Sequence, residues 1–113
     1  TADAMGIRLR FAELTAPDGA LDADLVVSTV PRGAADPLAG FAWRADQAVF
    51  DVVYDPWPTP LAAAASARGA KVISGALMLL HQAAAQVELM TGQEAPLPAM
   101  RAALHAAAPG CGV

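Results

Sequence analysis

The sequence has few of the residues from which disulfides, metal sites and hydrolytic triads are built. It contains one cysteine, Cys111, so no disulfide can form within the chain, and this scarcity fits a reduced, cytosolic environment. Its two histidines, His81 and His105, have no carboxylate or serine at a spacing that suits catalysis. The sequence therefore favours neither a zinc site nor a hydrolase, and we assign no metal and no role to Cys111.

Positive charge is also scarce. Seven Lys and Arg residues face eleven Asp and Glu residues, the net charge is −4, and the basic residues form no stripe, so no nucleic-acid partner is expected. The longest apolar run, residues 75–90, contains His81, two glutamines and Glu88, which favours a core helix over a membrane span. No signal peptide is visible, and the missing initial methionine suggests a truncated or processed chain.

Strand-like and helical stretches alternate along the chain, and this order predicts one α/β domain with a mainly parallel sheet. Runs rich in β-branched residues predict strands near 7–14, 24–30, 48–54 and 70–75. Apolar and alanine-rich stretches predict helices near 60–68, 76–91 and 98–108. Thr59 is expected to cap the first helix, while Gly69 and Gly92 are expected to end the first and the second.

The glycine-rich turn that opens a dinucleotide-binding domain is missing from this sequence. The only Gly-x-Gly, residues 110–112, follows a helical stretch at the end of the chain. Either the chain does not bind a nucleotide, or the first half of such a domain has been removed.

In a parallel sheet, ligands bind beyond the carboxyl ends of the strands. Three segments meet this condition, and all three are expected at the same edge: STVPRG (28–33), YDPWP (54–58) and SGALM (74–78). The second segment is rich in proline, which favours a rigid corner that holds a side chain in a fixed direction.

Two polar side chains near this edge are candidate ligand contacts. Tyr54 ends a strand, so its hydroxyl could face a polar ligand, or its ring could simply close the edge of the core. Gln82 shares one helix face with Met78 and Gln86, which recur every four residues. Gln82 is either a core glutamine bound to backbone or a contact for a polyhydroxy ligand.

Three blocks of sequence together resemble the C-terminal half of shikimate dehydrogenase, an NADP-dependent enzyme of aromatic amino-acid biosynthesis. They are DLVVSTVP (24–31), FDVVYDPWPTPL (50–61) and ISGALMLLHQAAAQVELMTGQ (73–93). The resemblance implies a partial Rossmann-like, doubly wound fold that lacks its first βαβ unit. It also implies the reversible NADPH-dependent reduction of 3-dehydroshikimate to shikimate in the intact enzyme.

The resemblance implies a role for individual residues. Tyr54 and Gln82 match the tyrosine and glutamine that contact shikimate through a hydroxyl and an amide. The residues that match positions along the cofactor NADP are Thr29, Val30, Val52, Gly75 and Met78.

Some positions depart from the pattern of the family. Ser74, Leu77 and Val30 stand where many relatives carry other residue types, which affects the cofactor loop more than the identity of the substrate. The family's substrate domain, with its catalytic lysine and aspartate, has no counterpart here. We therefore assign no catalytic residue to this chain and expect it to be inactive alone.

Two alternatives remain open. The chain could belong to a quinate/shikimate dehydrogenase-like paralogue that uses NAD, or it could be a non-catalytic binding or assembly module with the same fold. In the strand order 3-2-1-4-5-6, the strand near 7–14 would be strand 3 and would lack its neighbour, so it could be displaced. The strand near 24–30 would be strand 4 and would expose an apolar edge. Such an edge invites pairing with a second chain, so a homo-oligomer is possible.

Overall fold

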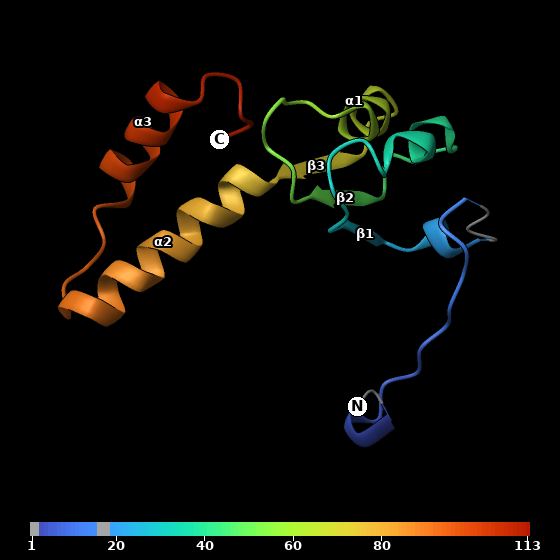
Figure 1. Ribbon diagram of the computed structural model, residues 1–113, viewed down its shortest axis with the longest axis horizontal. Helices are drawn as coiled ribbons and strands as arrows, with labels where there is room; N and C mark the ends of the chain where they lie inside the picture. The colour runs from blue at the N-terminus through green and yellow to red at the C-terminus, as the bar shows by residue number, and fades with distance from the viewer. Residues whose placement is uncertain (1–2, 16–18) are drawn as a thin grey trace.

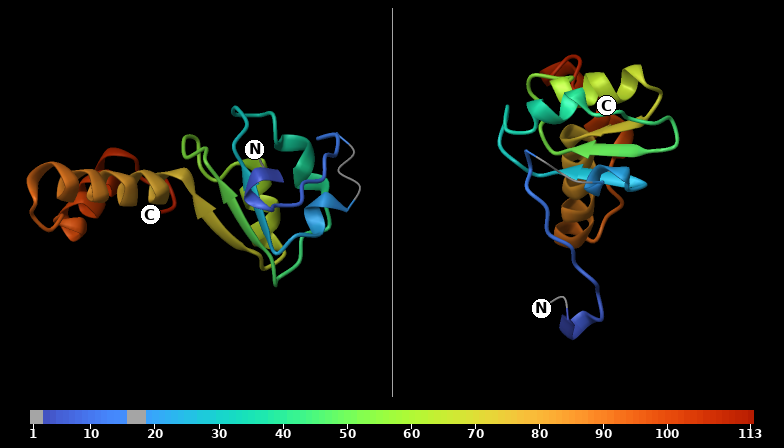
Figure 2. Two further views of the ribbon diagram at one scale, coloured as in Figure 1. Left: turned by 90° about the horizontal axis from the view of Figure 1, so that it is seen from below. Right: turned by 90° about the vertical axis from the view of Figure 1, so that its right-hand side faces the viewer.

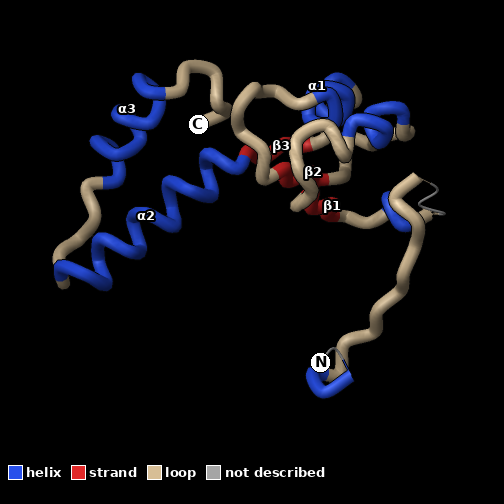
Figure 3. Tube along the Cα trace, viewed as in Figure 1, coloured by secondary structure: helices blue, strands red, loops and turns tan. Residues whose placement is uncertain are grey.

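Three parallel strands and three α-helices carry the fold of residues 3–15 and 19–113, which the computed structural model describes (Figure 1, Figure 3). The sheet runs in the order β1 (Leu25–Ser28), β2 (Ala48–Asp51) and β3 (Lys71–Ser74). The helices are α1 (Pro60–Ala67), α2 (Gly75–Thr91) and α3 (Leu97–Ala107). Short 3-10 turns are η1 (Asp3–Met5), η2 (Ala20–Asp22) and η3 (Asp36–Gly40). This arrangement confirms the predicted α/β class with a parallel sheet.

The main core lies on one face of the sheet, beneath α1 and η3 (Figure 2). Val26, Val49 and Val72 are partners in the strand register, so their side chains form a row across that face. This row packs with Leu61 and Ala65 of α1. Because burying a valine or leucine contributes about 1.5–3 kcal/mol, this layer supplies most of the packing energy of the sheet.

The opposite face of the sheet is only partly covered. Val27, Phe50 and Ile73 form the matching row there, again by strand register. Val27 remains 48% exposed and Leu25 51% exposed, although both are apolar. Helix layers normally cover both faces of a parallel sheet. The described residues therefore complete one layer of the fold and leave the other open.

Helices α2 and α3 form a hairpin that extends away from the sheet (Figure 1, Figure 2). α2 follows β3 without a loop, and the two helices pack on each other before the chain returns toward the sheet. The radius of gyration is 16.4 Å, whereas a compact domain of this length has about 13 Å. Within the described part of the chain, none of the helices has the length and apolar character needed to cross a membrane.

The strand predicted near 7–14 does not form. Residues 7–12 have no regular secondary structure, and Phe11 is 93% exposed. A strand is held by hydrogen bonds to a neighbouring strand, and β1 offers its bonds to β2 alone within the described sheet. The alternation of apolar and charged residues therefore did not lead to a strand, and of the predicted range Glu13 alone takes part in an isolated β-bridge among the described residues.

The other elements lie close to their predicted positions but the strands are shorter. Each helix agrees with its predicted bounds within one residue at either end, and the three strands are four residues long. Thr59 caps α1, since its Oγ1 accepts a hydrogen bond from the Ala62 N–H at 3.1 Å. Gly92 ends α2 with φ +67°, the left-handed conformation that favours glycine.

Candidate functional site

The carboxyl ends of the three strands form a straight row at one edge of the sheet. Ser28, Asp51 and Ser74 are the last residues of the strands and are partners in the register. The residues that follow them are Thr29, Val52 and Gly75, three of those matched to the cofactor. The Val52 N–H donates to the Ser28 carbonyl oxygen at 3.0 Å, which continues the pairing one residue past the strands. Parallel pairing therefore brings these three predicted site residues to a common edge.

Gly75 lies where α2 passes directly over the backbone of Val52. A Cβ atom at Gly75 would collide with the Val52 carbonyl oxygen and carbon. The backbone of Gly75 has an ordinary negative φ, so close approach, and not a left-handed conformation, is the reason for glycine. This requirement exists without any ligand, and a large side chain here would disturb the fold as well as a cofactor.

Met78 and Gln82 lie one and two turns into α2, and both side chains are exposed. The exposure of Gln82 is inconsistent with a core glutamine bound to backbone. It leaves the amide accessible from solvent, on the same helix face as Met78. The helix that starts at the sheet edge thus presents an apolar side chain close to the edge and an amide one turn further out.

Tyr54 lies in the corner between β2 and α1, three residues beyond the end of the strand. The strand was predicted to reach Tyr54, but it ends at Asp51 because the following residues turn away from the sheet. The Tyr54 side chain is 41% exposed, so it does not close the core. The two proline peptide bonds of the corner, Asp55–Pro56 and Trp57–Pro58, are cis.

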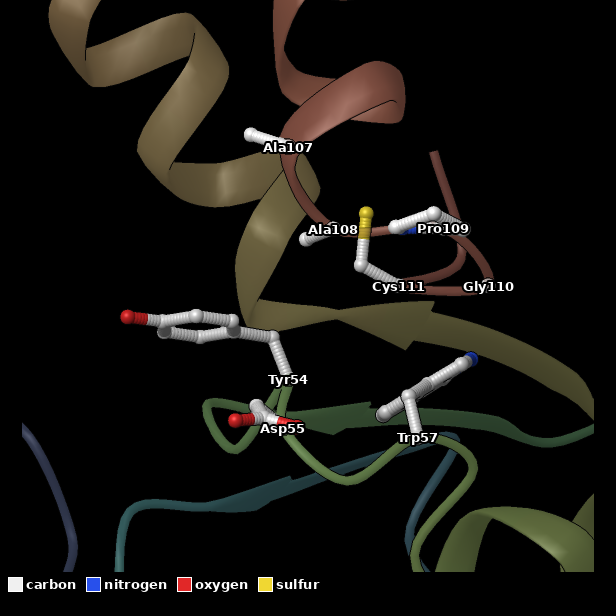
Figure 4. Close-up of a pocket in the computed structure, with 8 residues that line it drawn as sticks. All are labelled: Tyr54, Asp55, Trp57, Ala107, Ala108, Pro109, Gly110 and Cys111. Carbon is white, nitrogen blue, oxygen red and sulfur yellow. The ribbon is translucent and has the colours of Figure 1, made fainter.

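A cavity of about 260 Å³ lies between this corner and the C-terminal tail (Figure 4). In Figure 4, the corner contributes the Tyr54 and Trp57 rings, and the tail lies across from them. The lining residues are Tyr54, Asp55, Trp57, Ala107, Ala108, Pro109, Gly110 and Cys111. The return of the tail was not predicted from the sequence, because no local pattern states which distant segment a tail will contact.

The tail is fastened to the corner at Gly112. A Cβ atom there would lie 2.6 Å from Trp57 Nε1 and 3.1 Å from the Cβ of Ser74. The Ser74 Oγ hydroxyl donates to the Gly112 carbonyl oxygen at 3.4 Å. Glycine at position 112 also has φ +81°, which other residues rarely adopt. The Gly-x-Gly near the end of the chain is therefore a packing feature and not a phosphate-binding turn.

Asp51 is a buried acid that the sequence reading did not single out. Its side chain is 2% exposed, its Oδ2 accepts a hydrogen bond from Thr59 Oγ1 at 2.8 Å, and its Oδ1 accepts from the Val53 N–H at 3.2 Å. A buried carboxylate is costly unless donors surround it, and both oxygens of Asp51 have one. The available signal was an acid inside an otherwise apolar strand.

Ser28 is the counterpart of Asp51 on the neighbouring strand. It is also buried, at 7% exposure, but its Oγ has no hydrogen-bond partner among the described residues. Residues 3–15 and 19–113 contain no group of three His, Cys, Asp or Glu side chains that could hold a metal ion.

Known proteins match both the sequence and the fold. The family model described as Shikimate 5'-dehydrogenase C-terminal domain matches residues 75–105. The shikimate dehydrogenase (NADP(+)) of Halobacterium salinarum is 41% identical over 109 residues, which cover 93% of this chain and 40% of that protein.

Solved structures agree with the sequence comparison. The shikimate dehydrogenase of Mycobacterium tuberculosis is 47% identical, with a TM-score of 0.76 over 93% of this chain and 39% of its own. A quinate dehydrogenase from Corynebacterium glutamicum in complex with NAD is 30% identical, with a TM-score of 0.73 over the same shares. The chain thus spans about 40% of the length of these relatives. Sequence and fold together match this chain to the C-terminal part of the shikimate dehydrogenases.

Proposed function

We propose that this chain is the C-terminal part of the NADP-binding domain of a shikimate dehydrogenase. The whole enzyme would reduce 3-dehydroshikimate reversibly to shikimate with NADPH. The observation that carries this proposal is the row of strand ends, which brings Thr29, Val52 and Gly75 to one edge in parallel register. Helix α2 and the proline corner, which carry the other matched substrate and cofactor residues, both begin at that same edge.

The edge fits the nicotinamide half of the cofactor. Gly75 begins α2 directly at this edge and carries no side chain, so the exposed side of its backbone could meet a flat ring. Met78 is exposed one turn further on and could pack beside such a ring, whereas Val30, half-buried after β1, packs against the core over the sheet. NADPH supplies the hydride when bound, while these residues hold and orient its ring.

Tyr54 and Gln82 are proposed to bind the substrate. A tyrosine hydroxyl and a glutamine amide can each donate and accept, which suits the hydroxyl groups of shikimate. Both side chains are exposed, so no hydrogen bond within the core must break before they bind. Proton transfer to the substrate oxygen requires an acid or base, which the family resemblance locates in the substrate domain outside this sequence.

A quinate dehydrogenase that uses NAD is the second candidate. It is favoured by the structural match to the Corynebacterium glutamicum quinate dehydrogenase in complex with NAD. Its identity is 30%, against 47% for the Mycobacterium tuberculosis shikimate dehydrogenase, and this difference favours shikimate as the substrate.

A chimera tests the proposal. The part of the Mycobacterium tuberculosis enzyme that precedes the matched region would be joined to this chain and assayed with shikimate or quinate and with NADP⁺ or NAD⁺. We expect turnover of shikimate with NADP⁺, and none by the 113 residues alone. A preference for quinate over shikimate that the intact Mycobacterium tuberculosis enzyme does not share would support the second candidate. A folded chimera that neither binds NADPH nor turns over either substrate would refute both and favour a non-catalytic module.

A further inference from the structure

The corner that carries Tyr54 is held at its two ends by one side chain. Val53 lies at the start of the corner and Thr59 at its end, and both donate hydrogen bonds to the carboxylate of Asp51. Tyr54, Asp55 and Trp57 make no hydrogen bond to other described residues. The hydrogen bonds that fix the corner therefore lie at its two ends, while Trp57 in its middle packs against the tail at Gly112.

The hydrogen-bond geometry explains why an acid occupies position 51. The Thr59 Oγ1 oxygen already accepts from the Ala62 N–H at the start of α1, so its proton must find a separate acceptor. Asp51 Oδ2 is that acceptor at 2.8 Å, while Oδ1 remains free to accept from Val53. An asparagine offers one acceptor atom only, so it cannot accept from both groups through separate oxygens.

We propose that Asp51 is a positioning residue that sets the direction of Tyr54. It couples the end of β2, the start of the corner and the first turn of α1 through two charge-assisted hydrogen bonds. The bond from Thr59 is buried and so is protected from competition with water, and the bond from Val53 is partly buried. The relevance to catalysis rests on the proposed role of Tyr54 in substrate binding, but the coupling itself can be tested without any substrate.

Ser28 provides a matched control for this proposal. It is the register partner of Asp51, is almost as buried, and is a polar residue at the same edge. Its Oγ has no partner among the described residues, so Ser28→Ala removes a buried hydroxyl without releasing the corner. A general disturbance of the edge would affect both positions, whereas the proposed coupling affects Asp51 and Thr59 alone.

The chain has a single tyrosine, so 3-fluorotyrosine gives one ¹⁹F resonance that reports on Tyr54. We expect Thr59→Val and Asp51→Asn to move this resonance toward its position in the unfolded chain under conditions where the variants remain folded. Thr59→Ser keeps the hydroxyl and should restore the original position, and Ser28→Ala should leave it unchanged. A Thr59→Val resonance that coincides with that of the parent chain would overturn the proposal. The Thr59 pair decides the question if Asp51→Asn does not fold.

A double-mutant cycle in the chimera provides the functional readout. If Thr59 acts on the substrate through the Tyr54 hydroxyl, Thr59→Val should raise the KM for shikimate about threefold to tenfold with little change in kcat. In a Tyr54→Phe background the same change should have almost no further effect. Equal effects in the two backgrounds would contradict the coupling. If neither Thr59→Val nor Tyr54→Phe changes the KM for shikimate, but Thr59→Val still shifts the ¹⁹F resonance, the role of Tyr54 is refuted and that of Asp51 is not.

Discussion

The covered face of the sheet and the α2–α3 hairpin contain similar apolar residues, but these are buried in the first and largely exposed in the second. Leu61 of α1 is 0% exposed in the core over the sheet, whereas Leu89 near the end of α2 is 86% exposed. Both helices were recognisable from the sequence, and neither is strongly charged. The difference lies in what each helix packs on: α1 faces a sheet, and α2 faces mainly one helix. The first region is a self-contained core, and the second presents its surface outward from the carboxyl edge of the sheet.

This contrast explains why the candidate site straddles the two regions. The sheet fixes Thr29, Val52 and the start of the Tyr54 corner by strand register. The hairpin contributes Met78 and Gln82, whose side chains stay exposed. A rigid edge beside an exposed helix face suits a ligand that lies between them.

The largest expected effect is on the free energy of unfolding, and it tests the contrast in packing between α1 and the hairpin. Leu61→Ala removes a fully buried side chain and should lower the free energy of unfolding by about 2–5 kcal/mol. Leu89→Ala is the matched change in the hairpin and should alter it by less than about 0.5 kcal/mol. Urea unfolding followed by tryptophan fluorescence measures both. Equal losses in the two variants would mean that the hairpin is packed as tightly as the core.

The next effect concerns the exposed face of α2. Gln82→Ala in the chimera should lower kcat/KM for shikimate. The expected loss of transition-state stabilisation is about 1.5–3 kcal/mol, because a substrate hydroxyl would lose its proposed partner. Gln86→Ala lies one turn further along the same face and serves as the control. We expect no change in the free energy of unfolding for either variant, since both side chains are exposed. Equal kinetics for the Gln82 and Gln86 variants would remove Gln82 from the site.

A smaller effect is expected where the two regions meet. Gly75→Ala forces a Cβ atom into the Val52 backbone and should cost about 1–3 kcal/mol of stability. Gly40→Ala is a suitable control, because a Cβ atom at Gly40 meets nothing within 4 Å. Thermal or urea unfolding distinguishes the two. If Gly75→Ala is as stable as Gly40→Ala, the contact between α2 and Val52 is looser than the structure indicates.

The smallest change in stability is expected at the free edge of β1. The same substitution should nevertheless change how the chain self-associates. This edge has no strand partner among the described residues, and Leu25 and Val27 leave apolar surface beside it. We expect the 113-residue chain to self-associate in sedimentation experiments, and Val27→Lys to shift it toward the monomer. The lysine should change stability by less than about 0.5 kcal/mol because position 27 is half-exposed. A parent chain that sediments as a monomer at all concentrations would contradict this expectation.

Local signals in the sequence predicted the helices well. Thr59 and Pro60 start α1 and Gly92 ends α2 because capping depends on residues within one turn. The alternating order of elements also predicted the parallel sheet, since the crossover through α1 brings β3 back in the same direction as β2. The sites matched to Thr29, Val52 and Gly75 could be placed at one edge for the same reason.

Features that depend on distant contacts were not predicted. The strand order predicted that the stretch near 7–14 would lack its neighbour, but the local pattern still predicted a strand, and none forms over residues 7–12. The hydrogen bond from Thr59 to Asp51 depends on how the corner between β2 and α1 turns. The packing of Gly112 on Trp57 depends on the path of the C-terminal tail. Periodicity and caps carry no information about such pairs.

The most direct test of the central claim is a crystal structure of the chimera with shikimate and NADP⁺ bound. The account predicts that the Tyr54 hydroxyl and the Gln82 amide lie within about 3.2 Å of polar atoms of shikimate. It also predicts that the nicotinamide ring lies beside the Gly75 backbone, between Val52 and Met78. Shikimate bound with both side chains beyond hydrogen-bonding distance, or a nicotinamide ring away from this edge, would contradict the account.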